Sequence, residues 1–154
     1  MPENIRSTAK AIIIRDGKVL LNRSMGERIG EYYSLPGGGQ HQGECLEDAV
    51  LREIREETGC EAKIIRFAAL AEEIYTDPEL CAKYPDYCHR MMHIFIAEPL
   101  SWGDPTEMDH QMEGFEWISL EDIGSIELLP HKLKDQLPRI LAGETLWVGS
   151  EIIP

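Results

Sequence analysis

The segment LEDAVLREIREETG, at residues 46–59, constrains the fold of this chain more than any other. Its apolar positions recur three and four residues apart, as on one face of an amphipathic helix: Leu46, Val50, Leu51 and Ile54. Gly59 follows the pattern directly, and a glycine at this place commonly ends a helix. The sequence therefore predicts a helix over about 46–58 whose apolar stripe packs against a sheet.

Three glutamates lie on the same part of this helix. A rotation of about 100° per residue places Glu53, Glu56 and Glu57 on one arc beside the apolar stripe, so they border the core. Like charges at these spacings cost only about 0.2 to 0.5 kcal/mol per pair on a solvated helix. Taken alone, the three acids are compatible with an ordinary exposed face, and the residues around them decide the interpretation.

Glycine, acid and arginine surround the three glutamates at fixed spacing. Gly38 is followed after five residues by Glu44, and seven further residues lead to Arg52-Glu53-Ile54-Arg55-Glu56-Glu57-Thr58-Gly59-Cys60. This pattern resembles the Nudix box, the loop-helix-loop signature of the Nudix hydrolases. Cys60 stands where an aliphatic residue is commoner. Cys45 occupies the expected N-cap of the helix, where Ser or Thr would accept backbone hydrogen bonds better.

Apolar runs on both sides of the box predict strands. Residues 8–16 and 18–24 are joined by Asp16-Gly17, a strong hairpin signal, and should pair antiparallel. Later strands are predicted over three runs: 62–75, 89–98 and 113–119. These elements are similar to those of the family's α/β/α sandwich with a mixed central sheet. The resemblance therefore implies an α/β fold formed as a single domain over residues 1–154.

The remaining segments carry weaker signals. Residues 119–122 are a candidate helix cap, and a helical region is expected over 128–141, which Pro138 should interrupt or bend. The segment 76–88 is long for a connection between strands. It is either a loop that shapes specificity or subunit contacts, or a disordered surface loop.

Cleavage of a diphosphate requires cancellation of phosphate charge, an aimed water and a proton acceptor. Oxygen ligands on one rigid helical turn suit Mg²⁺, with Mn²⁺ as a substitute. The resemblance implies that Glu53, Glu56 and Glu57 are the metal ligands and that the carbonyl of Gly37 is a fourth. In this interpretation the glutamates tolerate their proximity because cations lie between them.

Arg52 and Glu44 are expected to support this site. Arg52 stays protonated and can fix carboxylate rotamers by paired hydrogen bonds, while Glu44 can accept such bonds just before the helix. Glu53 is the first candidate for the general base. Four later acids are alternatives, with Glu113 and Glu98 first among them: Glu98, Glu107, Glu113 and Glu116.

Substrate recognition is less constrained by the sequence. Gly38 and Gly39 of the loop are candidate substrate-binding residues, as are Arg23 and Arg28, although scattered surface arginines are the commoner explanation of the last two. Six aromatic side chains could stack on a base, and most are expected to lie in the core or at its rim: Tyr32, Tyr33, Tyr75, Tyr84, Phe95 and Trp117.

The resemblance implies a metal-dependent pyrophosphohydrolase that cleaves a small molecule, a nucleoside diphosphate linked to another moiety such as a nucleotide, a sugar or a second nucleoside. One alternative is the same chemistry on a non-nucleotide diphosphate or an RNA end. The other is a ligand sensor that keeps the fold without catalysis. Such a sensor usually lacks one or more box carboxylates, which this chain retains.

The charge balance limits the partners. Fifteen Lys and Arg against 28 Asp and Glu give a formal net charge of -13, which repels nucleic acid and anionic membranes. We therefore expect neither as a partner. The first residues lack a signal-peptide core, and no apolar run reaches the roughly 18 residues of a membrane helix. A soluble cytoplasmic protein is expected.

Four cysteines without CxxC spacing are expected to be free thiols. The alternative is a zinc site formed by four residues of the middle segment: Cys81, Cys88, His89 and His93. Trp102, Met91 and Met92 are candidates for a homodimer interface, and core packing is the alternative for the methionines.

Overall fold

The computed structural model describes residues 4–103 and 112–154, except for the side chains of residues 112 and 113. The strands are β1 (Arg6–Arg15), β2 (Lys18–Gly26), β3 (Gly30–Ser34), β4 (Gly37–Gly39), β5 (Cys60–Tyr75), β6 (His89–Trp102), β7 (Met112–Ser119), β8 (Leu128–Leu129) and β9 (Leu146–Ile153). The helices are α1 (Leu46–Thr58), α2 (Pro78–Lys83) and α3 (His131–Leu141), with 3-10 helices η1 (Pro85–Tyr87) and η2 (Leu120–Ser125).

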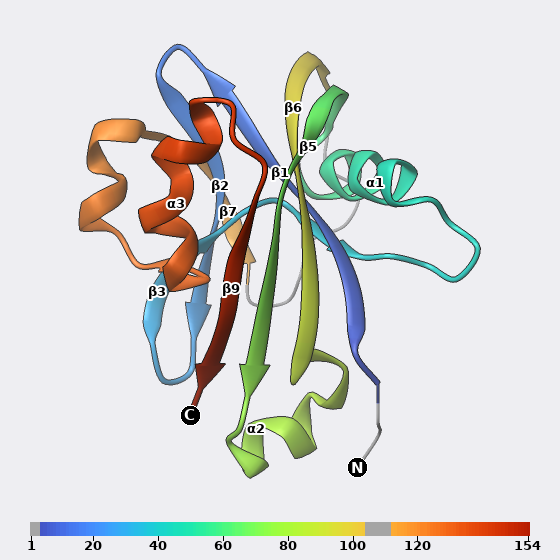
Figure 1. The fold of residues 1–154 in the computed structure, drawn as a ribbon, viewed down its shortest axis with the longest axis vertical. Coiled ribbons are helices and arrows are strands. Elements are labelled where there is room, and N and C mark those ends of the chain that lie inside the picture. Colours follow the sequence, from blue (N-terminus) through green and yellow to red (C-terminus); the bar gives the residue numbers. More distant parts are fainter. Residues whose placement is uncertain (1–3, 104–111) are drawn as a thin grey trace.

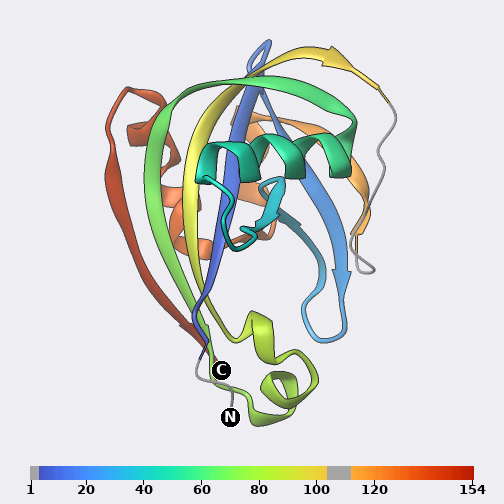
Figure 2. The same cartoon turned by 90° about the vertical axis from the view of Figure 1, so that its right-hand side faces the viewer.

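The strands form one curled, mixed sheet in the order β8-β3-β2-β1-β6-β5-β9, with β4 paired to β1 and β7 paired to β2. Strand β1 runs parallel to β6 and antiparallel to β2, while β5 runs parallel to β9. Helices α1 and α3 lie on opposite sides of the strands (Figure 1), and Figure 2 shows α1 lying across the sheet. The α/β/α sandwich with a mixed central sheet is confirmed.

Two apolar cores result because both faces of the central strands are covered. Along β1, Ala11 and Ile13 pack with Val50 and Ile54 of α1, whereas Ile12 between them faces the other core. That second core holds three buried side chains of α3: Leu133, Leu137 and Ile140. The near-continuous apolar run of β1 is therefore a strand buried on both faces.

The two strongest local predictions are confirmed. Asp16 and Gly17 both have positive φ, 51° and 74°, as a tight two-residue hairpin between β1 and β2 requires. Helix α1 ends at Gly59, whose φ of 76° is left-handed and whose N–H donates to the carbonyl of Arg55. Cys45 is the N-cap residue, and its thiol makes no capping hydrogen bond.

Other segments differ from the prediction. Helix α3 continues through Pro138, so the expected interruption is wrong. Segment 76–88 is mostly helical, as α2 and η1, and is not a structureless loop. Ser119 precedes a 3-10 helix and makes no side-chain cap. The short strands β3, β4 and β8 and the edge strand β9 were not predicted. No helix within 4–103 or 112–154 is long and apolar enough to cross a membrane.

Candidate active site

The glycine segment lies against β1, and at Gly37 the backbone of β1 leaves no room for a side chain. Gly37 has φ 140°, and a Cβ there would lie 2.1 Å from the carbonyl oxygen of Ala9. A Cβ on Gly38 would lie 2.6 Å from the carboxylate of Glu53. The missing side chains let this short strand pass between β1 and α1, so its backbone lies directly beside the acidic face of the helix.

Arg52 organises the acidic face of α1. Its Nη1 donates to Glu53 Oε1 at 2.9 Å and to Glu56 Oε2 at 3.2 Å. Its Nε and Nη2 donate to the two oxygens of Glu44 at 2.8 and 3.0 Å, and Nη2 also donates to the carbonyl of Gly39 at 2.9 Å. Arginine has five N–H donors, and these five bonds use them all. Arg52 thus has no donor left for a substrate, which supports a positioning role.

Glu57 points away from Arg52, toward the glycine segment. Its Oε2 accepts hydrogen bonds from Asn22 Nδ2 at 2.8 Å and from the N–H of Gly37 at 3.1 Å. Burial raises the pKa of Glu57 to about 7, against the opposing effect of the nearby Lys10 ammonium. Lys10 Nζ donates to the carbonyl of Gly37 at 3.2 Å, and burial lowers the pKa of Lys10.

Two adjoining cavities open at this site. The smaller, about 470 Å³, is lined by Glu53, Glu56 and Glu57, and the larger, about 910 Å³, lies beyond it. Five residues line both cavities: Lys10, Gly37, Glu57, Tyr87 and Arg90. The acidic cavity therefore continues into a space of the size that small-molecule ligands occupy.

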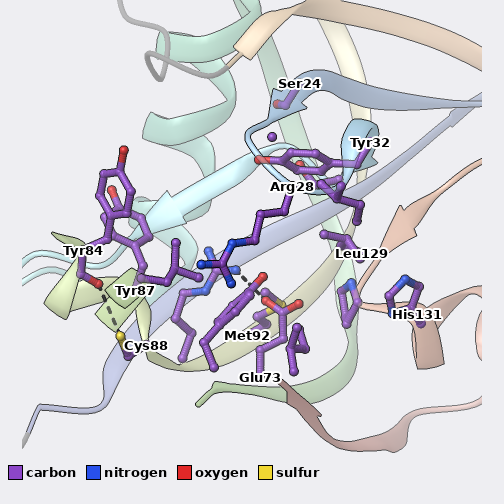
Figure 3. Close-up of a pocket in the computed structure, with 18 of the residues that line it drawn as sticks. Ser24, Arg28, Tyr32, Glu73, Tyr84, Tyr87, Cys88, Met92, Leu129 and His131 are labelled. Atoms are coloured by element: carbon purple, nitrogen blue, oxygen red, sulfur yellow. Dashed lines mark hydrogen bonds and ion pairs between the residues drawn. The ribbon is translucent and has the colours of Figure 1, made fainter. Parts of the chain in front are cut away.

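Residues of several strands, of the turn between β2 and β3 and of the 76–88 segment line the larger cavity. Figure 3 shows Tyr84 and Tyr87 on one side, Leu129 and His131 on the other, and Met92 with Glu73 opposite Tyr32. The whole lining combines aromatic and apolar side chains with several charged ones, such as Lys10, Glu73 and Arg90. Such a lining can hold an organic ligand that also carries charge.

The predicted arginines lie in different places. Arg28 lines the larger cavity, where its guanidinium forms ion pairs with Asp77 and Glu79. Arg23 lines neither cavity and pairs with Glu31 and Glu116.

Two of the four alternative bases lie outside both cavities. Glu98 is exposed on β6, and neither it nor Glu116 lines either cavity. Glu107 and the side chain of Glu113 lie outside the described residues. Glu53 is the candidate base that lines the acidic cavity.

The candidate aromatic residues divide between cavity and core. Tyr32, Tyr75 and Tyr84 line the larger cavity. The other three pack in or against the apolar cores: Tyr33, Phe95 and Trp117. Met92, a candidate for a homodimer interface, is buried and lines the larger cavity. Its position therefore agrees with the alternative, core packing.

Several site residues were missed by sequence reasoning: Arg6, Lys10, Asn22, Glu73, Tyr87 and Arg90. Lys10 had a usable signal, because a lone lysine between Ala9 and Ala11 in an apolar strand must reach a partner. Arg6 and Arg90 had none, because only strand pairing brings them together.

The candidate ligand atoms at the site fit a hard divalent cation, because they are all oxygens: those of the Glu53, Glu56 and Glu57 carboxylates and of the Gly37 carbonyl. Among the described residues, however, no three Asp, Glu, His or Cys side chains converge as a preformed cation site. Here Arg52 holds Glu53 and Glu56, and Asn22 holds Glu57.

All four cysteines are free, and the thiols of Cys81 and Cys88 donate to the carbonyls of Tyr75 and Tyr84.

Comparison with known proteins gives the same family. The NUDIX domain family model matches residues 5–142. The chain is 29% identical over 140 residues to an RNA pyrophosphohydrolase of Sphingopyxis alaskensis, covering 84% of this chain and 85% of that protein. It is 30% identical over 112 residues to the NAD-capped RNA hydrolase NudC of Pseudomonas putida, covering 73% of this chain and 36% of that one.

The chain spans only about a third of the length of several curated relatives that it matches. Among solved structures, a NUDIX hydrolase from Nitrosomonas europaea superposes with a TM-score of 0.71 at 21% identity, covering 93% of both chains. The family match, the complete box and the shared fold agree, and the chain therefore belongs to the Nudix hydrolase family.

Proposed function

We propose that this protein is a divalent-metal-dependent pyrophosphohydrolase acting on a nucleoside diphosphate linked to another moiety. One observation carries the proposal: the cavity lined by Glu53, Glu56 and Glu57 opens into a larger one lined by aromatic side chains. The first suits a metal-bound diphosphate, and the second suits an aromatic organic group such as a nucleoside.

In this proposal Glu53, Glu56, Glu57 and the Gly37 carbonyl would hold Mg²⁺ or Mn²⁺. When bound, the cation would supply charge neutralisation for the phosphates and lower the pKa of a bound water. Glu53 accepts the proton of the attacking water. Arg52 holds the carboxylates of Glu53 and Glu56, and Glu44 in turn fixes Arg52. The substrate's diphosphate lies in the acidic cavity and its organic group in the larger one.

Relatives named for RNA ends suggest a second substrate class. The RNA pyrophosphohydrolase and the NAD-capped RNA hydrolase both carry RNA in their names. A net charge of -13 weighs against a long polyanion here, because RNA binding depends on cationic residues along the backbone path. A small nucleotide derivative is therefore our first choice.

The test is a panel of diphosphates incubated with Mg²⁺, with Mn²⁺ or with EDTA, followed by chromatographic separation of substrate and products. It should include nucleotide sugars, dinucleotides, nucleoside triphosphates and a 5′-triphosphorylated RNA. We expect metal-dependent cleavage of at least one small nucleotide derivative. Cleavage of the RNA alone would favour the second class, and no cleavage with either metal would favour a ligand sensor.

The matched variants are Glu57→Gln and Glu61→Gln. Glu57→Gln should lower turnover by about 100-fold or more with the fold retained, because a metal ligand is lost while the amide still accepts from Asn22. Glu61, four positions after Glu57, is an exposed acid paired with Arg55, and its variant should keep normal turnover. Near-normal activity of Glu57→Gln would reject the ligand assignment.

A further inference from the structure

Two arginines face each other on neighbouring strands beside the site. Arg6 of β1 and Arg90 of β6 are register partners in the parallel pair, so their side chains lie on one face of the sheet. Like charges directly opposite are unfavourable in a sheet. Both residues line the acidic cavity, and Arg90 also lines the larger one. The pair thus places two positive charges in the acidic cavity, and one of them, Arg90, lies where the two cavities meet.

A buried carboxylate fixes one of the two arginines. Glu73 of β5 is the register partner of Arg90 on its other side, is fully buried, and accepts from Arg90 Nη2 at 2.5 Å. Among the described residues, Glu73 Oε2 and Arg90 Nε are buried without a hydrogen-bond partner. The ion pair therefore holds Arg90 in place without satisfying all of its hydrogen-bonding capacity.

Tyr87 of the 76–88 segment contacts both arginines. The Cζ of Arg6 lies 4.9 Å from the centroid of its ring, and the Cζ of Arg90 lies 5.8 Å from it. Guanidinium groups at these distances are attracted to the face of an aromatic ring. Helix η1 thus supplies a ring that contacts both arginines and that itself lines both cavities.

Arg6 has no carboxylate of its own. Within the part of the chain that the structure describes it forms no ion pair, and its guanidinium lies against Gly39, where a Cβ would be 2.3 Å from Nη2. Arg52, by contrast, is fully engaged with carboxylates and a carbonyl. The charge of Arg6 is therefore available to an anion in the cavity, and that of Arg52 is not.

We propose that Arg6 and Arg90 bind the substrate phosphate that lies farther from the box glutamates, with Tyr87 and Glu73 as the residues that position them. This inference rests on the proposed function and deepens it. The phosphate bound at the junction carries the organic group, which then enters the larger cavity. The substrate class that fits is a diphosphate with a bulky substituent, and the 76–88 segment is part of its binding site.

The test measures binding of methylenediphosphonate, a diphosphate analogue that cannot be hydrolysed, to the whole chain by calorimetry in Mg²⁺. Arg6→Gln should weaken binding by about fivefold or more, because a charge-assisted contact is lost. Arg55→Gln is the control, since Arg55 is an exposed arginine paired with Glu61 that lines neither cavity. Equal affinity of wild type and Arg6→Gln would overturn the proposal.

Arg90 and Tyr87 need their own variants. Arg90→Gln alone would leave Glu73 buried and unpaired, so the double variant Glu73→Gln with Arg90→Gln tests the contact with both charges removed. We expect it to bind the analogue about fivefold more weakly or worse. Tyr87→Phe should bind normally and Tyr87→Leu about two- to fivefold more weakly, because it is the aromatic face of residue 87, and not its hydroxyl, that contacts the two arginines. Equal binding of the analogue by the Tyr87→Phe and Tyr87→Leu variants would reject the positioning role of Tyr87.

The binding and turnover measurements separate this proposal from the proposed function. If the analogue binds and Arg6→Gln weakens it while no diphosphate is cleaved, the anion site stands and the hydrolase function fails. If cleavage depends on Glu57 but neither the Arg6 nor the Arg90 variant alters binding, the hydrolase function stands and this inference fails. Absence of binding by wild type up to roughly 10 mM analogue also overturns it.

Discussion

Arg52 binds both carboxylate oxygens of Glu44, through Nε at 2.8 Å and Nη2 at 3.0 Å. Glu44 precedes α1 and Arg52 lies within it, so the pair ties the end of the loop to the helix. The N–H of His41 donates to the same carboxylate at 3.1 Å. These hydrogen bonds lower the pKa of Glu44 to about 2, and those from Arg52 have the largest effect.

The lowered pKa of Glu44 predicts a pH-dependent loss of stability. A carboxylate whose folded pKa lies below its ordinary value of 4.5 stabilises the fold above that value, and the contribution disappears as pH falls from 4.5 toward 2. Glu44→Gln should therefore be less stable than wild type at pH 7, and the difference should shrink through this window. Urea unfolding at several pH values measures it. A difference that does not change with pH would contradict the prediction, and Glu98→Gln, an exposed acid on β6, is the control.

The elements with strictly local causes were predictable from sequence. Helix α1 follows from its apolar periodicity and Gly59, and the β1–β2 hairpin follows from Asp16-Gly17. The box residues Glu44 and Arg52 were assigned a positioning role, and their bidentate pair supports it. Each of these inferences uses residues close together in the chain.

Features that depend on pairing of distant strands were not predictable. Arg6 and Arg90 are 84 positions apart and meet only because β1 and β6 run parallel in one particular register. Strand β9 is an edge strand with exposed Trp147 and Ile152, so its pattern lacks the apolar run of a buried strand. Pro138 was expected to interrupt or bend the helical region, and α3 continues through it, because the buried apolar face of α3 outweighs the lost backbone bond.

The N-terminus of helix α3 is capped by a side chain of strand β9. Its N-cap is Pro130, which offers no capping side chain, while Glu151 of β9 accepts from the N–H groups of His131 and Lys132, each at 3.1 Å. Glu151→Ala should therefore lower the free energy of unfolding by about 1 to 2 kcal/mol. Urea denaturation measures the change. Glu144→Ala, which removes an exposed acid paired with Arg139, should cost less than Glu151→Ala, and equal effects of the two would refute the cap.

The N-cap of α1 offers the opposite test, a gain of stability. Cys45 has the extended backbone of an N-cap residue, φ -72° and ψ 148°, but its thiol makes no capping hydrogen bond. Serine at this position should accept one from the first turn and stabilise the protein by about 0.5 to 1 kcal/mol. Thermal unfolding of Cys45→Ser checks the gain, and Cys45→Ala shows the effect of removing the thiol alone. An unchanged or lower melting temperature for the serine variant would reject the prediction.

Gly38→Ala tests whether the glycine segment positions the acidic face. A Cβ on Gly38 would lie 2.6 Å from the carboxyl carbon of Glu53, so that side chain must leave Arg52. Because the obstructing atom belongs to a flexible side chain, we expect a stability loss of only about 1 to 2 kcal/mol but a fall in turnover of about tenfold or more. Gly124→Ala is the control, since nothing lies within 4 Å of its Cβ position, and it should alter neither quantity. Full turnover of Gly38→Ala would show that the position of Glu53 does not limit catalysis.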